Sequence, residues 1–233
     1  MSVRSLRPVV LLVLVLGSLA ITASSAVYFD ADEYAPFVME KLELPLPNEA
    51  RYIHALQLHV VAAAFALPAC LLLLSRTVMR RVPRVHRWLG RLTGSVTVLA
   101  LVPSGFYLSL FAKGGFVGTL GFMLSGAIVV VAMVMGVRAA RAGRYAAHRR
   151  FVLHVVAQLA VAVVSRGMLF AADAARLDHD TAYLVSLWLP VLGCAAIVEW
   201  LAGPRHPSWR NHASLSSRRR HPRAHVEPGF SRI

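Results

Sequence analysis

Six long apolar stretches, separated by short polar or charged segments, dominate the sequence. Each is close to the roughly 20 residues that a helix needs to cross about 30 Å of hydrocarbon. They lack the alternation of apolar and polar residues that membrane barrel strands show. The pattern predicts an all-α integral membrane bundle of six transmembrane helices within residues 1–202. The predicted spans cover approximately residues 8–28, 53–75, 92–112, 117–137, 151–172 and 182–202.

The segments between these stretches alternate in charge along the chain. Residues 29–52 sum to −4 and residues 173–181 to −2, whereas residues 76–91 sum to +6 and residues 138–150 to +5. Short loops rich in arginine remain on the cytoplasmic side of a membrane. The alternation therefore predicts a multi-pass membrane protein with both termini in the cytoplasm.

The overall composition adds a second constraint, because 57% of the residues are apolar and only 15% are charged, with a net charge of +14. Such a positive charge is also typical of nucleic-acid binding, but here its positions along the chain explain it. We therefore expect the lipid bilayer as the partner and no nucleic acid. Anionic lipid headgroups are expected at the basic face. Residues 203–233 are predicted to be a basic, disordered cytoplasmic tail.

The first apolar stretch has two interpretations. Residues 1–26 combine a basic start, an apolar run and A-S-S-A, which together resemble a signal peptide. The apolar run is long for a signal peptide. We expect an uncleaved membrane anchor, with cleavage as the alternative.

Three histidines are predicted near the basic side of the membrane: His86, His148 and His154. Imidazoles on different helices at one depth are what a b-type haem requires as axial ligands. Of the three, only His154 falls inside a predicted span. These residues are the candidate cofactor ligands, and the alternative is that they anchor helix ends at the interface.

Arg166 is the most informative ionisable residue, because a charge this deep in a span is costly and suggests function. It is expected about 8 Å from the midplane on the outer side, at the level of His59 and Tyr107. No acidic residue is expected at that depth. These three residues are the candidate ligand pocket, with a carboxylate or phosphate group paired to Arg166. The alternative is that Arg166 extends its head to the outer headgroups.

Two polar stripes follow helical spacing. One comprises Thr93, Thr97 and Ser104 on the third span, and the other His154, Gln158 and Ser165 on the fifth. Stripes of this kind usually form hydrogen bonds to neighbouring helices. We expect them to serve helix packing.

Motifs for hydrolysis or metal binding are absent from the sequence. It contains no HExxH, GxSxG or P-loop motif, and its two cysteines, Cys70 and Cys194, lie in apolar runs without a CxxC pair. No metal site is predicted, and no residue is assigned a catalytic role. Whether the protein is an enzyme is left open.

Several short motifs carry a family resemblance across roughly residues 50–200. They are H-R-W-L-G-R at 86–91, S-G-F-Y-L-S at 104–109 and A-R-A-G-R-Y-A-A-H-R-R-F at 140–151. With them the chain resembles the bacterial multi-span membrane family catalogued as domain of unknown function 2306. Where that family commonly has Trp after H-R-R, this chain has Phe151. The resemblance implies the fold and a location in a bacterial inner (cytoplasmic) membrane, but no catalytic roles.

Three functions remain open at this point. The first is a b-haem or quinone-linked redox protein that uses the three basic-side histidines. The second is a non-redox small-molecule binding or transport module with a polar cavity at Arg166. The third is a structural or assembly subunit without a ligand.

Overall fold

The computed structural model describes residues 3–29, 36–43 and 46–202, and the regular elements within these residues are helices. Six helical segments are long and apolar enough to cross a membrane, which confirms the all-α, six-span prediction. The orientation of the termini stays a prediction, and the tail 203–233 lies outside the described residues. The spans are Pro8–Phe29, Glu49–Leu73, Pro83–Ser109, Gly115–Arg141, Tyr145–Ala174 and His179–Ala202.

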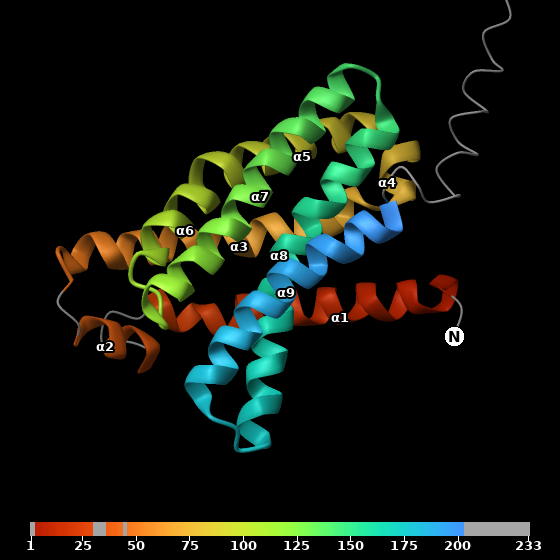
Figure 1. Cartoon of the computed structure of the whole chain (residues 1–233). Coiled ribbons are helices and arrows are strands. Elements are labelled where there is room, and N and C mark those ends of the chain that lie inside the picture. Colours follow the sequence, from red (N-terminus) through yellow and green to blue (C-terminus); the bar gives the residue numbers. More distant parts are fainter. Residues whose placement is uncertain (1–2, 30–35, 44–45, 203–233) are drawn as a thin grey trace, which may run out of the picture.

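The helices follow one another with short connections (Figure 1). The first span is α1 (Val3–Ser24) with a 3₁₀ turn, η1 (Ser25–Phe29), and α2 (Pro36–Leu42) precedes the second span, α3 (Glu49–Leu73). The third span is composite. It consists of α5 (Pro83–Val96), a π-helical turn η2 (Thr97–Leu101) and α6 (Val102–Ser109), and α4 (Arg76–Arg81) comes before it. The remaining spans are α7 (Gly115–Arg141), α8 (Tyr145–Ala174) and α9 (His179–Ala202).

The third span begins at Pro83, nine residues before the predicted start at 92. Proline is well suited to the first turn of a helix, where its missing N–H has no partner to lose. Residues 83–91 carry arginines, so the apolar pattern excluded them although they continue the helix. Further along, Pro103 cannot donate to the preceding turn, and the π-helical turn directly before it accommodates this break.

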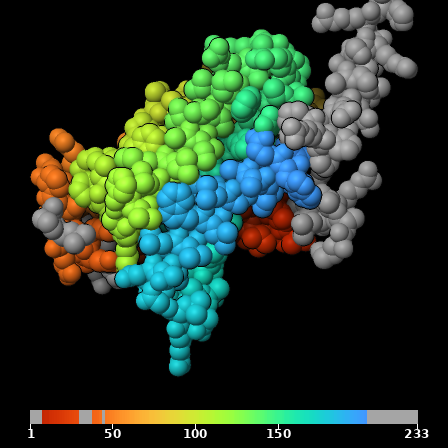
Figure 2. Space-filling model, viewed as in Figure 1, coloured from red at the N-terminus to blue at the C-terminus, as the bar shows by residue number. Residues whose placement is uncertain are grey.

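The most extensive helix contacts are α7 with α8 and α8 with α9, while α3 packs against the whole third span and against α1. The central core joins Leu67 and Cys70 of α3 to Val129 of α7 and Val155 of α8. Figure 2 shows α7 and α9 side by side on one face of the molecule. Five large side chains, each 72–78% exposed, lie on the outside of the spans and suit contact with the membrane. They are Leu99, Phe116, Tyr145, Phe170 and Trp200.

The two ends of the bundle differ in charge. We call the end that carries α4, the start of α5 and the α7–α8 turn the basic end. The opposite end carries α2, the α6–α7 turn and the α8–α9 turn. There Val38 of α2 packs on Tyr52 and Leu56 of α3, and Lys113 forms an ion pair of 3.2 Å with Asp180 at the start of α9.

Candidate functional site

His154 lies buried near the basic end of α8 and pairs with Glu199 of α9. Its Nε2 is 2.7 Å from Glu199 Oε1, and its Nδ1 is buried without a hydrogen-bond partner. Arg150, one turn earlier on α8, donates from Nε to Glu199 Oε1 at 3.2 Å and contacts the other carboxylate oxygen through Nη2. The result is a two-helix network in which one carboxylate accepts from an arginine and a histidine.

Sequence reasoning missed Glu199 as the partner of His154. The sequence did contain a signal, namely the depth of each of the two residues within its predicted span. Glu199 is close to the end of the last span and His154 is close to the start of the preceding one. Because consecutive spans run in opposite directions, the two positions fall at one level.

The other two basic-side histidines have different surroundings. His148 donates from Nδ1 to the carbonyl of Gly136 on α7 at 2.9 Å. His86 of α5 is partly buried, its Nδ1 has no hydrogen-bond partner, and it lies close enough to His148 for their charges to interact. Within the part of the chain that the structure describes, no group of three His, Cys, Asp or Glu side chains could hold a metal ion.

A haem or redox role gains no support from this geometry. The Nε2 atom of His154 is held by a carboxylate, and His148 is bonded to the backbone of another helix. His154 and His148 are therefore directed to separate partners rather than to one shared ligand, and the Nδ1 atom of His86 has no hydrogen-bond partner within the described residues.

Arg166 lies on α8 in the half nearer the opposite end, and its side chain is exposed on the surface of the bundle. Its guanidinium donates from Nη1 to the carbonyl of Ala162, one turn back, at 3.1 Å. Among the described residues, no carboxylate lies within ion-pair distance of it; the described ion pairs join Lys113, Arg150, His154 and His179 to their acids. Arg166 is thus a cation at membrane depth with only a backbone partner.

His59 of α3 lies within electrostatic range of Arg166. Its Nδ1 is 3.1 Å from the carbonyl of Leu101 and 3.2 Å from the hydroxyl of Ser104. A Cβ on Gly105 would come within 3.0 Å of the imidazole Cε1, so this glycine allows the ring to lie against α6. His59 therefore ties α3 to the third span just beyond the π-helical turn.

Tyr107, the third residue of the predicted pocket, joins an aromatic cluster instead. Its ring packs on Phe111 with a centroid distance of 5.4 Å, and Phe111 packs on Tyr52 at 5.6 Å. No hydrogen bond within the described residues connects it to Arg166 or His59. The structure thus brings two of the three predicted pocket residues into one neighbourhood.

The polar stripe of α8 serves helix packing, as expected. Gln158 accepts from Ser125 of α7 at 2.9 Å and donates to the carbonyl of Val191 on α9 at 3.0 Å. Ser165 donates to the carbonyl of Ser186 on α9 at 2.6 Å. These bonds link three helices inside the membrane.

The stripe of the third span is different. The hydroxyls of Thr93 and Thr97 are buried and have no hydrogen-bond partner, whereas Ser104 donates to the carbonyl of Ala100 at 2.6 Å. Buried hydroxyls without partners are rare and call for an explanation.

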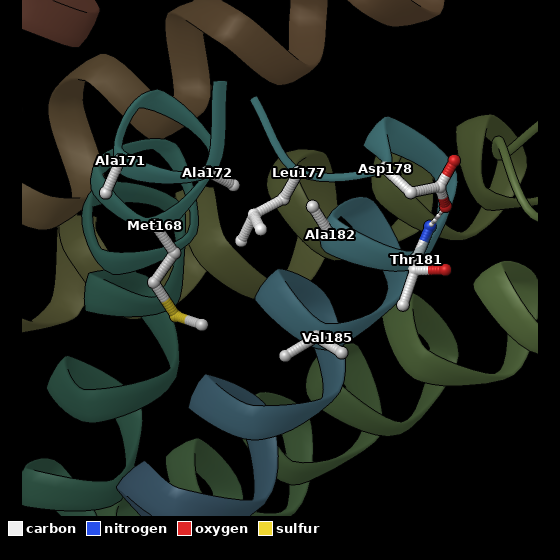
Figure 3. A pocket seen from close by; sticks show the side chains of 8 residues that line it. All are labelled: Met168, Ala171, Ala172, Leu177, Asp178, Thr181, Ala182 and Val185. Atoms are coloured by element: carbon white, nitrogen blue, oxygen red, sulfur yellow. Dashed lines mark hydrogen bonds between the residues drawn. The ribbon is translucent and has the colours of Figure 1, made fainter. Parts of the chain in front are cut away.

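A pocket of about 540 Å³ lies between α8 and α9 at the opposite end (Figure 3). It is lined mainly by apolar side chains such as Met168 and Leu177, and it contains neither Arg166 nor His59. Its carboxylate, Asp178, accepts from the backbone N–H of Thr181 at 2.8 Å and caps α9. This hydrogen bond holds the pKa of Asp178 below its ordinary value of 3.8. Because Asp178 is engaged in the helix cap, the pocket offers few polar groups that could bind a ligand.

Comparison with known proteins gives one match. The family described as predicted membrane protein, domain of unknown function 2306 (DUF2306), matches residues 56–202, which is more than half of the chain. No curated protein and no solved structure matches the chain significantly. The matched region runs from α3 to the end of α9 and so contains His59, Arg166 and the His154–Glu199 pair. The six-span bundle and this match together place the chain in the DUF2306 family of membrane proteins.

Proposed function

We propose that this protein is a non-redox binding module that takes the anionic group of a small amphiphile at Arg166. The observation that carries the proposal is a guanidinium within a membrane span that, among the described residues, bonds to a backbone carbonyl and forms no ion pair. A cation in this position is costly unless it faces protein, water or an anion. The planar guanidinium fork matches a carboxylate or a phosphate in two parallel hydrogen bonds.

The surroundings of Arg166 favour an amphiphile over a simple soluble anion. Phe170, one turn further along the same face of α8, is 78% exposed and offers apolar surface for a chain. His59 adds an imidazole within electrostatic range of the guanidinium. A ligand with an acidic head and an apolar tail would satisfy both features.

The redox alternative rests on His154, His86 and His148, but His154 and His148 bind separate partners, which leaves this alternative without structural support. A structural subunit without a ligand would leave Arg166 unexplained except as an interface anchor. The binding role is therefore the function that the geometry supports best.

We also propose that the basic end faces the cytoplasm of a bacterial inner membrane, where it meets anionic lipid headgroups. Support comes from the exposed arginines of α4 and α5 and from Trp88, which is 69% exposed and lies 5.3 Å from the Arg91 guanidinium. Tryptophan and arginine together are typical of a membrane interface.

Native mass spectrometry of the purified full chain tests the binding role. The probes are palmitate, dodecyl phosphate and the uncharged hexadecanol. We expect palmitate or dodecyl phosphate, but not hexadecanol, to bind, and the stronger of the two identifies the head group. Arg166→Ala should abolish binding, since it removes the cation that pairs with the acidic head group. Arg51→Ala, at an exposed arginine near the same end, should bind as the wild type does. Equal binding of hexadecanol and palmitate would refute the proposal.

A further inference from the structure

The first part of α5 carries two neighbouring stripes of exposed side chains. Within each stripe the residues are three and four positions apart, so they are neighbours on one side of the helix. The residues of the apolar stripe are 50–69% exposed. The arginine stripe consists of Arg84, Arg87 and Arg91, and the apolar stripe consists of Val85, Trp88 and Leu92, each one residue further along.

The other side of α5 is packed against the bundle. Thr93 is 1% exposed, and α5 contacts α3. A Cβ on Gly94 would lie 3.6 Å from the sulfur of Met133 on α7. These contacts fix the rotation of α5 and hold both stripes on the outside of the bundle. The Arg91 guanidinium lies 5.3 Å from the centroid of the Trp88 ring, so a cation–π contact joins the two stripes.

The length of the third span places the arginine stripe at the level of the lipid headgroups. Residues 92–109 contain no charged side chain, and at 1.5 Å per residue they extend about 27 Å. That length nearly fills the roughly 30 Å of hydrocarbon in a bilayer. The arginine stripe therefore lies just outside the hydrocarbon, where the lipid phosphates are, and Leu92 of the apolar stripe lies at its edge.

The chain supplies little negative charge to balance these arginines. No acidic residue occurs in the sequence between Glu49 and Asp173. Glu199, at the same end of the bundle, already accepts from Arg150 and His154. Among the described residues, no ion pair includes a member of the arginine stripe. The complement of this surface is therefore an anion from outside the chain, and the membrane offers one as a lipid phosphate.

We propose that the outer face of α5 is a binding site for one anionic phospholipid, with its phosphate on the arginine stripe and an acyl chain along the apolar stripe. A planar guanidinium donates two parallel hydrogen bonds to a phosphate, and neighbouring arginines about 5–6 Å apart at Cβ can share one phosphate. Phosphatidylglycerol is favoured over phosphatidylethanolamine, because the ammonium group of the latter neutralises its own phosphate. The site rests on the proposed contact of the basic end with anionic headgroups and narrows it to one surface.

Lipid binding measured by native mass spectrometry tests the site. The full chain in detergent is titrated with phosphatidylglycerol and with phosphatidylethanolamine of the same acyl chains. The ionic strength is about 0.15 M, so that charges more than about 8 Å away are largely screened. We expect the wild type to bind phosphatidylglycerol more tightly than phosphatidylethanolamine. The triple substitution Arg84→Gln, Arg87→Gln and Arg91→Gln should weaken the binding of phosphatidylglycerol about tenfold, equivalent to 1.4 kcal/mol.

The matched control removes the same charge from exposed positions around the α7–α8 turn, by Arg138→Gln, Arg141→Gln and Arg144→Gln, and should bind phosphatidylglycerol as the wild type does. If the stripe variant does not fold, Arg87→Gln and Arg141→Gln are compared instead. Equal binding by the stripe variant and the control would overturn the site, but would leave the general headgroup contact standing. Equal binding of the two lipids by the wild type would overturn both. Neither result bears on Arg166, which is tested with palmitate.

Discussion

Glu199 places His154 in an ion-pair network rather than in an apolar core. Its carboxylate receives the His154 imidazole and the Arg150 guanidinium from the neighbouring helix. The network lies at the basic end, where its side chains are partly exposed, 47% for Glu199 and 30% for Arg150. Solvent screening therefore limits the stabilisation that it supplies.

Substituting Glu199 by Gln should lower the melting temperature in detergent by an amount equivalent to about 1 kcal/mol, the upper end for exposed pairs. The loss arises because glutamine removes the negative charge and one of the two accepting oxygens that Arg150 and His154 share. Asp180→Asn, in the more exposed Lys113 pair, is the control and should cost less than about 0.5 kcal/mol. Equal melting temperatures for wild type and Glu199→Gln would show that the network contributes nothing.

The carboxylate of Asp178 makes the free energy of unfolding depend on pH. Its folded-state pKa is lowered by the hydrogen bond from Thr181, so the stabilisation is present above the ordinary value of 3.8. It is lost as the pH falls through the lower folded-state pKa. Asp178→Ala should melt below the wild type at neutral pH, and the difference should shrink on acidification below that value. A difference that is constant between pH 6 and pH 2.5 would contradict the cap.

At the scale of single elements, sequence reasoning predicted the helices better than their ends. The apolar runs indicate α7 and α9 almost to their ends, because hydropathy and span coincide there. For the third span, the apolar pattern predicts neither the first residue of the helix nor the π-helical turn within it. Its first turns are rich in arginine, and its π-helical turn depends on how the backbone adjusts before Pro103. Neither feature produces a run of apolar residues that the sequence would reveal.

Close packing at Gly118 fixes the turn between α6 and α7. A Cβ at this position would collide with the backbone carbonyl of Lys113, which cannot move as a flexible side chain can. Gly118→Ala should therefore destabilise the protein by about 1–3 kcal/mol. Gly193→Ala in α9, where no atom lies within 4 Å of the added Cβ, should be neutral or slightly stabilising. Thermal unfolding of both variants checks this, and equal behaviour would contradict the packing.

For the molecule as a whole, hydropathy predicts the number of spans, and loop charge predicts the side of the membrane on which each loop lies. The shared level of His59 and Arg166 was also predictable from depth alone. Which helices are neighbours was not, because the side-chain pairs that decide it, such as Gln158 with Ser125 and Val191, come from distant parts of the chain. For the same reason Tyr107 shares a level with Arg166 but packs elsewhere.

The topology of the whole chain has a direct test. Reporter fusions after Leu46 and after Val82 should report opposite compartments, with the second in the cytoplasm, because the segments there carry −4 and +6. A fusion after Arg141 should match the one after Val82. If the first two fusions report the same compartment, the six-span arrangement is wrong.

The central claim is that Arg166 holds an anionic head group, and the dissociation constant of palmitate in wild type, Arg166→Lys and Arg166→Ala tests it most directly. Lysine retains the length and the charge but not the planar fork. We predict that Lys weakens binding about tenfold, or 1.4 kcal/mol, and that Ala weakens it further. Equal dissociation constants in all three proteins, or binding of neither palmitate nor dodecyl phosphate by the wild type, would contradict the claim and leave Arg166 as an interface anchor.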